Sequence, residues 1–301
     1  YMGIINKMVV STLPLVPKGI VRKFANRYIA GETLAHAVAT SKKLNAKGIM
    51  GTIDVLGEDV FKKEDATRSK NECLEVLDAI KEHSLNSNQS IKLTSLGLKI
   101  DKEFCLSNVK EIFAKAKEKN IFVRIDMEDS SVTNDTIWVF TEARKTYSNC
   151  GIVLQAYLRR TYDDAAKLIE SGTNFRLCKG IYIEPEEIAF KERQEVRDNF
   201  LKILRLMLEK DSYVGIATHD EYLVEGAYKL IEELKKPKDR YEFQMLLGVR
   251  EGMRDKIVKD GHRMRIYIPF GTHWYQYSIR RFKENPQMAG YVIKSILNGG
   301  K

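Results

Sequence analysis

The sequence predicts an α/β protein built as a (βα)8 barrel of the TIM type, because short apolar runs alternate with helical segments along the chain. Segments such as 108–118 and 165–170 carry apolar residues at i, i+3, i+4 and i+7, which is typical of helices that bury one face. The apolar runs between such segments are branched and short, as buried parallel strands are. In chain order, the eight expected strands are Gly48–Asp54, Ile91–Thr94, Ile121–Asp126, Gly151–Gln155, Asn174–Lys179, Tyr213–Thr218, Tyr241–Met245 and Met264–Ile268.

Eight strand–helix units with repeated spacing favour closure into a barrel. The chain has 301 residues, 44% of them hydrophobic, which is enough for one large core. A doubly wound open sheet is the alternative. Such a sheet is expected to carry GxGxxG after an early strand, or GxxxxGK followed by Ser or Thr, and neither pattern occurs.

Helical segments surround the expected strands. Residues 1–46 precede the first strand as a basic helical segment, in which Ala25–Lys43 is expected to form a helix packed on the barrel or on a membrane surface. Residues 47–301 are expected to form the barrel, with 65–81 as its extended first helix. The last helix, which begins near Tyr277, is expected to lie over the barrel mouth, at the carboxyl ends of the strands.

The positive charge is concentrated near the N-terminus. The net charge is +9, and residues 1–48 contain eight Lys or Arg against one acid, Glu32. The same stretch is apolar in part, so a lipid surface is a better anionic partner than nucleic acid, which would call for interleaved aromatic and basic residues that are not found. A solvated basic face packed against the barrel is the other interpretation. Since no run approaches the roughly 20 apolar residues of a membrane span, we expect a cytoplasmic protein, in peripheral contact at most with the inner face of the cell membrane.

Neither a metal site nor a disulfide framework is expected. The four cysteines, Cys73, Cys105, Cys150 and Cys178, are far apart and form no CxxC pair. The five histidines show no spacing that would place two ligands on one helix face.

Polar side chains occur where the expected strands end. In a parallel barrel these ends meet at the mouth, where active sites lie. Structural ion pairs within the barrel explain any one of these residues, but less readily the whole set. The set is Asp54, Lys92, Asp126, Gln155, Arg176, Lys179, Thr218, His219, Gln244 and Tyr267.

A second signal comes from the last expected helix, which contains adjacent arginines. Arg281 and Glu284 are three residues apart on one helix face and can pair, while Arg280 points elsewhere. Arginine binds carboxylates through two parallel hydrogen bonds, so this pair suits a small carboxylic acid substrate. A solvated dibasic face is the alternative.

Six sequence strings together resemble the proline dehydrogenases in their short bacterial monofunctional form. They are residues 91–97 (IKLTSLG), 124–128 (RIDME), 175–182 (FRLCKGIY), 216–219 (IATH), 242–248 (EFQMLLG) and 277–284 (YxxRRxxE). The resemblance runs from about Gly48 to Leu297 in the correct order. It implies a flavin-binding barrel that oxidises L-proline to Δ1-pyrroline-5-carboxylate, the first step of proline catabolism to glutamate. It also implies FAD as the cofactor and a quinone as the electron acceptor, although the residues themselves leave FMN open.

The resemblance also implies roles for individual residues. Lys92, Arg280 and Arg281 would hold the proline carboxylate, Glu58 would pair with Arg281, and Glu284 would orient the arginines. Tyr182, Leu246, Tyr267 and Tyr277 would pack around the ring, with Asp126 beside Lys92 and Tyr267. The expected flavin-binding residues are Asp126, Gln155, Arg176, Cys178, Lys179, Gly180, Thr218, His219 and Gln244.

The sequence departs from the family pattern at two positions. Asp220 stands where Asn more often follows the Thr-His pair, and Cys178 replaces a branched aliphatic residue. Both affect the expected flavin contacts rather than the reaction. A rival interpretation is an aldolase that forms a Schiff base through Lys92 or Lys179 and needs no flavin.

Overall fold

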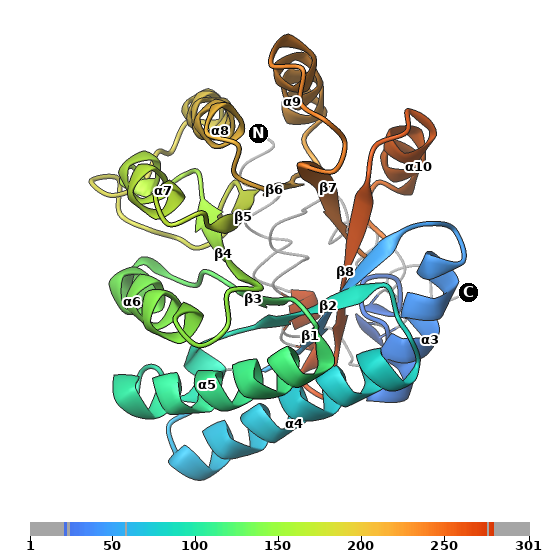
Figure 1. The fold of residues 1–301 in the computed structure, drawn as a ribbon, viewed down its shortest axis with the longest axis vertical. Coiled ribbons are helices and arrows are strands. Elements are labelled where there is room, and N and C mark those ends of the chain that lie inside the picture. The colour runs from blue at the N-terminus through green and yellow to red at the C-terminus, as the bar shows by residue number, and fades with distance from the viewer. Residues whose placement is uncertain (1–20, 23–24, 58, 276, 280–301) are drawn as a thin grey trace, which may run out of the picture.

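The computed structural model describes residues 21–22, 25–57, 59–275 and 277–279. Its eight strands are all parallel and close into a barrel in sequence order, as predicted (Figure 1). The strands are β1 (Met50–Val55), β2 (Ser87–Ile91), β3 (Val123–Ile125), β4 (Cys150–Gln155), β5 (Asn174–Cys178), β6 (Val214–Ala217), β7 (Tyr241–Leu246) and β8 (Met264–Phe270). The barrel closes where β8 pairs with β1, from Met50 opposite Arg265 to Val55 opposite Phe270.

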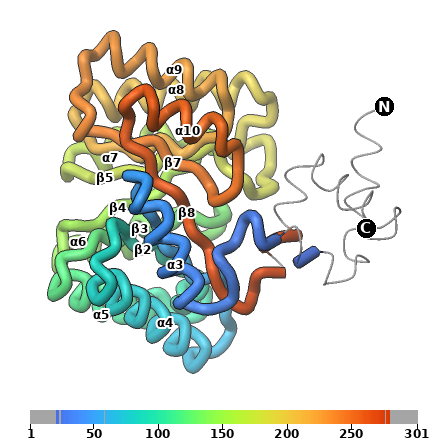
Figure 2. The backbone as a smooth tube through the Cα atoms, turned by 90° about the vertical axis from the view of Figure 1, so that its right-hand side faces the viewer, coloured from blue at the N-terminus to red at the C-terminus, as the bar shows by residue number. Residues whose placement is uncertain are grey.

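Helices cover the outside of the barrel (Figure 1). They are α3 (Leu34–Asn45), α4 (Lys63–Glu82), α5 (Lys102–Lys119), α6 (Thr133–Arg144), α7 (Thr161–Ile169), α8 (Arg193–Glu209), α9 (Glu221–Glu233) and α10 (Glu251–Lys259). Local signals set the ends of α5: the Asp101 side chain accepts a hydrogen bond from Phe104 N at 3.1 Å, and Asn120 ends the helix in the left-handed conformation. Figure 2 shows α3 beside β8, and α3 contacts both β8 and β1.

The core lies between the barrel and its helices. Alternate strand residues such as Ile53, Val123, Phe175 and Phe243 are fully buried in one apolar cluster with the helices. This alternation follows from the period of two along a strand, which sends successive side chains to opposite faces.

The barrel interior is polar instead. Arg176 on β5 reaches Ser90 on β2, and Arg124 on β3 reaches Asn174 on β5. Because neither pair belongs to neighbouring strands, these contacts must cross the inside of the barrel. The interior therefore positions charged groups instead of the branched apolar layers usual in such barrels.

Two sequence-based boundaries are wrong. The second strand was expected at Ile91–Thr94, but β2 is Ser87–Ile91, and a 3-10 helix, η2, covers Thr94–Leu96. The helix expected over Ala25–Lys43 begins only at Leu34, because turns precede it and Gly31 adopts a φ of 143°, which a helix cannot contain. Most of the last expected helix lies outside the described residues, so its placement stays a prediction.

Across the part of the chain described, no helix is both long and apolar enough to cross a membrane.

Candidate functional site

The predicted site residues that the structure describes all line one pocket at the carboxyl ends of the strands. Its volume is about 270 Å³. Its predicted members are Lys92, Asp126, Gln155, Arg176, Cys178, Lys179, Gly180, Tyr182, Thr218, His219, Gln244, Leu246, Tyr267 and Tyr277. Glu58, Arg280, Arg281 and Glu284 lie outside the described residues, so their placement stays a prediction.

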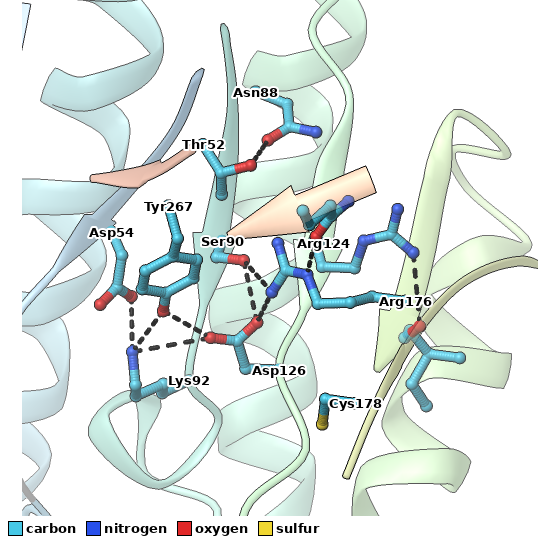
Figure 3. A network of polar contacts seen from close by, with 12 residues as sticks. Thr52, Asp54, Asn88, Ser90, Lys92, Arg124, Asp126, Arg176, Cys178 and Tyr267 are labelled. Atoms are coloured by element: carbon cyan, nitrogen blue, oxygen red, sulfur yellow. Dashed lines mark hydrogen bonds and ion pairs between the residues drawn. The ribbon is translucent and has the colours of Figure 1, made fainter. Parts of the chain in front are cut away.

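Lys92 lies between two carboxylates and a phenol on one side of the pocket (Figure 3). Its Nζ is 2.5 Å from Asp54 Oδ1 and 3.7 Å from Asp126 Oδ2. It also donates to the Tyr267 hydroxyl at 3.1 Å, and that hydroxyl donates to Asp126 Oδ2 at 2.8 Å. These groups come from β1, the end of β2, the end of β3 and β8, which barrel closure brings together.

Arg176 is held in the pocket by three polar partners. Its Nη1 pairs with Asp126 Oδ1 at 2.7 Å and donates to Ser90 Oγ at 3.2 Å. Its Nε donates to Gln244 Oε1 at 2.5 Å, and Gln244 Nε2 donates in turn to Glu242 Oε1 at 2.6 Å. These contacts fix the orientation of the guanidinium, and none of them involves Nη2.

The electrostatics keep Asp126 and Lys92 charged and Tyr267 neutral, whereas burial raises the pKa of the Asp54 carboxyl. Burial opposes the charge on Asp126, but Arg176 and Lys92 hold the pKa of that carboxyl below its usual value. Burial would lower the pKa of the Lys92 ammonium, yet Asp54 and Asp126 together raise it. Burial and the Asp126 charge raise the pKa of Tyr267 well above its usual value, so its hydroxyl stays a donor.

The turn after β2 positions Lys92. Ser95 Oγ donates to Lys92 O at 2.8 Å, and Thr94 donates to the Glu128 carboxylate from its backbone N at 2.9 Å and from Oγ1 at 2.5 Å. Gln155 Nε2 donates to Glu128 O at 2.7 Å. Glu128 thereby ties the Lys92 turn to the end of β4.

The segment after β5 forms another wall, and it depends on a glycine. Gly180 has a φ of 108°, and a Cβ at this position would lie 2.1 Å from the Tyr157 ring. A few residues on, the Glu184 carboxylate accepts hydrogen bonds from Ser130 N at 2.7 Å and Ser130 Oγ at 2.5 Å. Tyr182 lies between Gly180 and Glu184 in the chain and lines the pocket.

A second pocket of about 370 Å³ adjoins the first and shares Lys179 and His219 with it. Its other charged lining residues are Arg193, Arg197, Arg250, Asp220 and Glu221, so cations outnumber acids, and Arg250 pairs with Glu221 at 3.0 Å. Asp220 organises it: its carboxylate is 2.8 Å from Arg197, 3.4 Å from Lys179 and 3.6 Å from Arg193. Although partial burial opposes ionisation, these cations lower the pKa of Asp220 to about 2.

The two departures from the family pattern both line these pockets. Asp220 holds cations, as described above, in a way that an Asn could not. Cys178 is half-buried with its Sγ 3.6 Å from Leu154 O, and burial raises the pKa of its thiol to about 11. The thiol is therefore neutral near pH 7, and Cys178 acts as a small apolar residue.

Sequence reasoning missed four residues of the site. Asp54 was recognised at a strand end but was given no role, although it holds Lys92. Glu128 follows Asp126 by two residues, and this spacing could have indicated it. Arg193 and Arg197 lie on α8, one turn apart, so inspection of strand ends alone could not reveal them.

Comparisons with known proteins place the chain in a family. A family model described as proline dehydrogenase matches residues 37–294. Proline dehydrogenase 1 of Bacillus subtilis is 38% identical over 273 residues, which cover 91% of this chain and 90% of that protein. Proline dehydrogenase of Deinococcus radiodurans is 32% identical over 280 residues, with coverage of 91% and 90%.

Among solved structures, proline utilization A from Bdellovibrio bacteriovorus, inactivated by N-propargylglycine, is similar with a TM-score of 0.82 and 29% identity. The match covers 88% of this chain but only 33% of that one, so this chain spans about a third of the larger protein.

Proposed function

The chain belongs to the proline dehydrogenase family, and from that membership we propose that it oxidises L-proline to Δ1-pyrroline-5-carboxylate and passes the electrons through a flavin to a quinone. Membership itself makes the chain an oxidoreductase of proline catabolism with a flavin cofactor. The product, the acceptor and the form of the flavin are the proposed parts. The reaction would be the first step from proline to glutamate.

The observation that supports this proposal most directly is the convergence of Lys92, Asp126, Arg176 and Tyr267 at one pocket. The Lys92 ammonium is partly buried, held charged and fixed by two carboxylates. Such a group suits the carboxylate of a small amino acid, because a pre-positioned cation gains Coulomb energy without first being ordered. Arg280 and Arg281 are proposed to complete this carboxylate site.

The same contacts argue against the aldolase alternative. A Schiff-base lysine needs a lowered pKa so that its amine is neutral. Asp54 and Asp126 do the opposite at Lys92. Lys179, the other candidate, forms an ion pair with the Asp220 carboxylate at 3.4 Å.

The pocket residues suit a flavin. The donors and amides of Arg176, Gln155, Lys179 and Gln244 line a pocket that also has apolar walls, as a flat ring with polar edges requires. When bound, the flavin supplies the hydride acceptor, and protein groups near its ring nitrogens tune it. Arg176 is the residue proposed to do this, because Asp126 and Gln244 fix its guanidinium.

The second pocket supports FAD rather than FMN. It shares Lys179 and His219 with the first and is lined by Arg193, Arg197 and Arg250. Cations of this kind suit the pyrophosphate of a dinucleotide, which FMN lacks. The cofactor released by acid should therefore be FAD when it is identified by chromatography.

In this proposal the remaining pocket residues orient the substrate. Lys92 would bind the carboxylate, while Leu246, Tyr182, Tyr267 and Tyr277 would pack around the ring and exclude water. Orientation of this kind contributes to the rate because reacting atoms must approach to about 3–3.5 Å. Asp126 would keep both Lys92 and Arg176 in place.

The location and the membrane contact are also proposals. Cys73, Cys105, Cys150 and Cys178 are all free thiols, which fits a reducing cytoplasm. Delivery of electrons to a quinone calls for an approach to the membrane, and the basic residues 1–46 are the part proposed for that contact.

Anaerobic titration with L-proline tests the proposed reaction. The purified protein should be yellow, and its visible absorbance should bleach as L-proline is added and return with a soluble quinone. Glycine serves as the control, because it has the carboxylate but no ring to oxidise. A coloured protein that L-proline leaves unbleached would refute the proposal.

A further inference from the structure

A basin lies at the amino-terminal end of the barrel, opposite the mouth. It has a volume of about 520 Å³ and is lined from the starts of β2, β5, β7 and β8. Five cationic side chains line it against one carboxylate: Lys81, Lys119, Arg124, Arg263 and Arg265 against Glu242. The proposed proline site at the mouth uses none of the five cations, and Glu242 is linked to it only through Gln244, from which it accepts a hydrogen bond at 2.6 Å.

Arg124 is the innermost of the cations. It is 1% exposed, and no carboxylate among the described residues forms an ion pair with it. Its Nη atoms donate to Asn174 O at 3.0 Å and to Asn174 Oδ1 at 2.6 Å, while its Nε is buried without a hydrogen-bond partner in the described protein. The fold makes room for this side chain at Gly151, where a Cβ would lie 2.5 Å from Nη1.

This arrangement leaves a buried charge without a counter-charge, which is costly in a protein interior. Burial, and to a smaller extent repulsion from Arg176, lowers the pKa of the Arg124 guanidinium to about 9. A structural ion pair would have prevented that shift. Ser87 Oγ, also at the basin, is a second buried polar atom without a partner among the described residues.

Glu242, the one carboxylate in the described lining of the basin, already has partners in the protein. Glu242 pairs with Arg265 at 2.6 Å and accepts from Tyr213 OH at 2.7 Å. Lys119 pairs with Asp78 at 2.9 Å, outside the basin lining. Among the described residues, neither Lys81 nor Arg263 forms an ion pair, so with Arg124 three cations at the basin have no counter-charge from the protein.

We propose that this basin is a binding site for a phosphate dianion, either free or carried by a small organic molecule. Arg124, Lys81 and Arg263 supply the charge. The amides of Asn86, Asn88, Asn120 and Asn174 add hydrogen-bonding groups. Arginine and neighbouring amides suit the several acceptor oxygens of a phosphate better than a single-point anion.

The size and walls of the basin suit an organic phosphate. A volume of about 520 Å³ is within the range of small-molecule sites and exceeds the needs of one phosphate. The apolar side chains of Ile80, Leu85, Ile121 and Phe122 also line it and would contact the carbon skeleton.

Calorimetric titration of the flavin-loaded full chain tests this site. Inorganic phosphate and phenyl phosphate would each be titrated at an ionic strength held constant with sodium chloride. We expect saturable binding of one equivalent; tighter binding of phenyl phosphate identifies an organic ligand, and equal binding identifies free phosphate. The double variant Lys81→Gln with Arg263→Gln should weaken either by about tenfold or more.

A matched control distinguishes a site from general charge attraction. Lys110→Gln removes one cation from the exposed face of α5, outside the basin, and should change the affinity by less than about twofold. Absence of saturable heat with the parent protein would overturn the proposal, as would a double variant that binds as well as the parent. If Lys110→Gln weakened binding as strongly as the double variant, the attraction would be nonspecific and the site would be refuted.

Discussion

Lys92, Asp126, Arg176 and Tyr267 stabilise one another in a place where each alone would be unfavourable. An isolated buried charge costs several kcal/mol. Here Asp126 lies 3.7 Å from Lys92 and 2.7 Å from Arg176, so each charge has an opposite charge nearby. Tyr267 adds a hydroxyl that joins Lys92 to Asp126. The site is therefore ordered before any substrate arrives, which reduces the entropy lost on binding.

Tyr267→Phe tests this joining role. The variant keeps the ring that is proposed to pack against the substrate but removes the hydrogen bonds of 3.1 Å to Lys92 and 2.8 Å to Asp126. Two lost bonds to charged groups should lower kcat/KM for proline by about tenfold to a hundredfold, roughly 1.4 to 3 kcal/mol. Steady-state kinetics would measure the effect, and a kcat/KM equal to that of the parent would show that the hydroxyl has no such role.

At the level of secondary structure, the segments that follow the strands build the pocket walls. The segment after β5 is the longest of those that line the pocket, running from Lys179 to the start of α8 at Arg193. Its course depends on Gly180, whose backbone passes directly against Tyr157. Lys179, Gly180 and Tyr182 all line the pocket, so a shift here would affect both cofactor and substrate contacts.

Gly180→Ala should therefore weaken retention of the flavin. The added Cβ would lie 2.1 Å from the Tyr157 ring at a φ of 108°, so the segment must move. The flavin-to-protein absorbance ratio after gel filtration would measure the loss. Gly252→Ala is the matched control, because its Cβ would meet nothing within 4 Å. Equal flavin content in the two variants would contradict the proposed dependence.

Across the entire barrel, buried charges make stability depend on pH. Glu242 is 1% exposed and pairs with Arg265. Burial alone would raise the pKa of the Glu242 carboxyl, but the attraction of Arg265 outweighs that effect and lowers the pKa from 4.5 to about 2. A lowered folded pKa contributes stability that is fully present above the unfolded pKa. That contribution is lost as pH falls through the window between about 4.5 and about 2.

Glu242→Gln should flatten this part of the acid-stability profile. The parent should lose melting temperature steeply below about pH 4.5, because the unfolded chain then takes up a proton that folded Glu242 refuses. The variant should be less stable at pH 7, since Arg265 loses its counter-charge, but its slope below pH 4.5 should be smaller. Circular dichroism melts between pH 3 and 7 would measure both, and identical acid slopes would contradict the assignment.

Much of the fold and of the pocket could be predicted from local pattern. The alternation of apolar strands with helices predicted the closed parallel barrel. Polar residues at strand ends predicted nine of the 20 residues that line the pocket, and the family resemblance added five more. The start of β2 could not be predicted, because Ser87–Gln89 is polar and only tertiary contacts reveal its setting: Asn88 accepts a hydrogen bond from Thr52 on β1, and Gln89 donates to Cys73 O on α4. Likewise, the turns before Leu34 are set by Gly31, which helical periodicity does not detect.

By itself, the sequence determined the fold class, the family and the set of residues that gather at the mouth, because periodicity and motifs are local properties of a chain. The tertiary structure alone decided which charges meet. Asp54 holds Lys92 from another strand, and Arg193 and Arg197 join Asp220 from a helix. Arg124 remains buried and forms no ion pair with any residue that the structure describes. These pairings depend on distances across a closed barrel, and electrostatic energy falls with distance in space, not with separation along the chain.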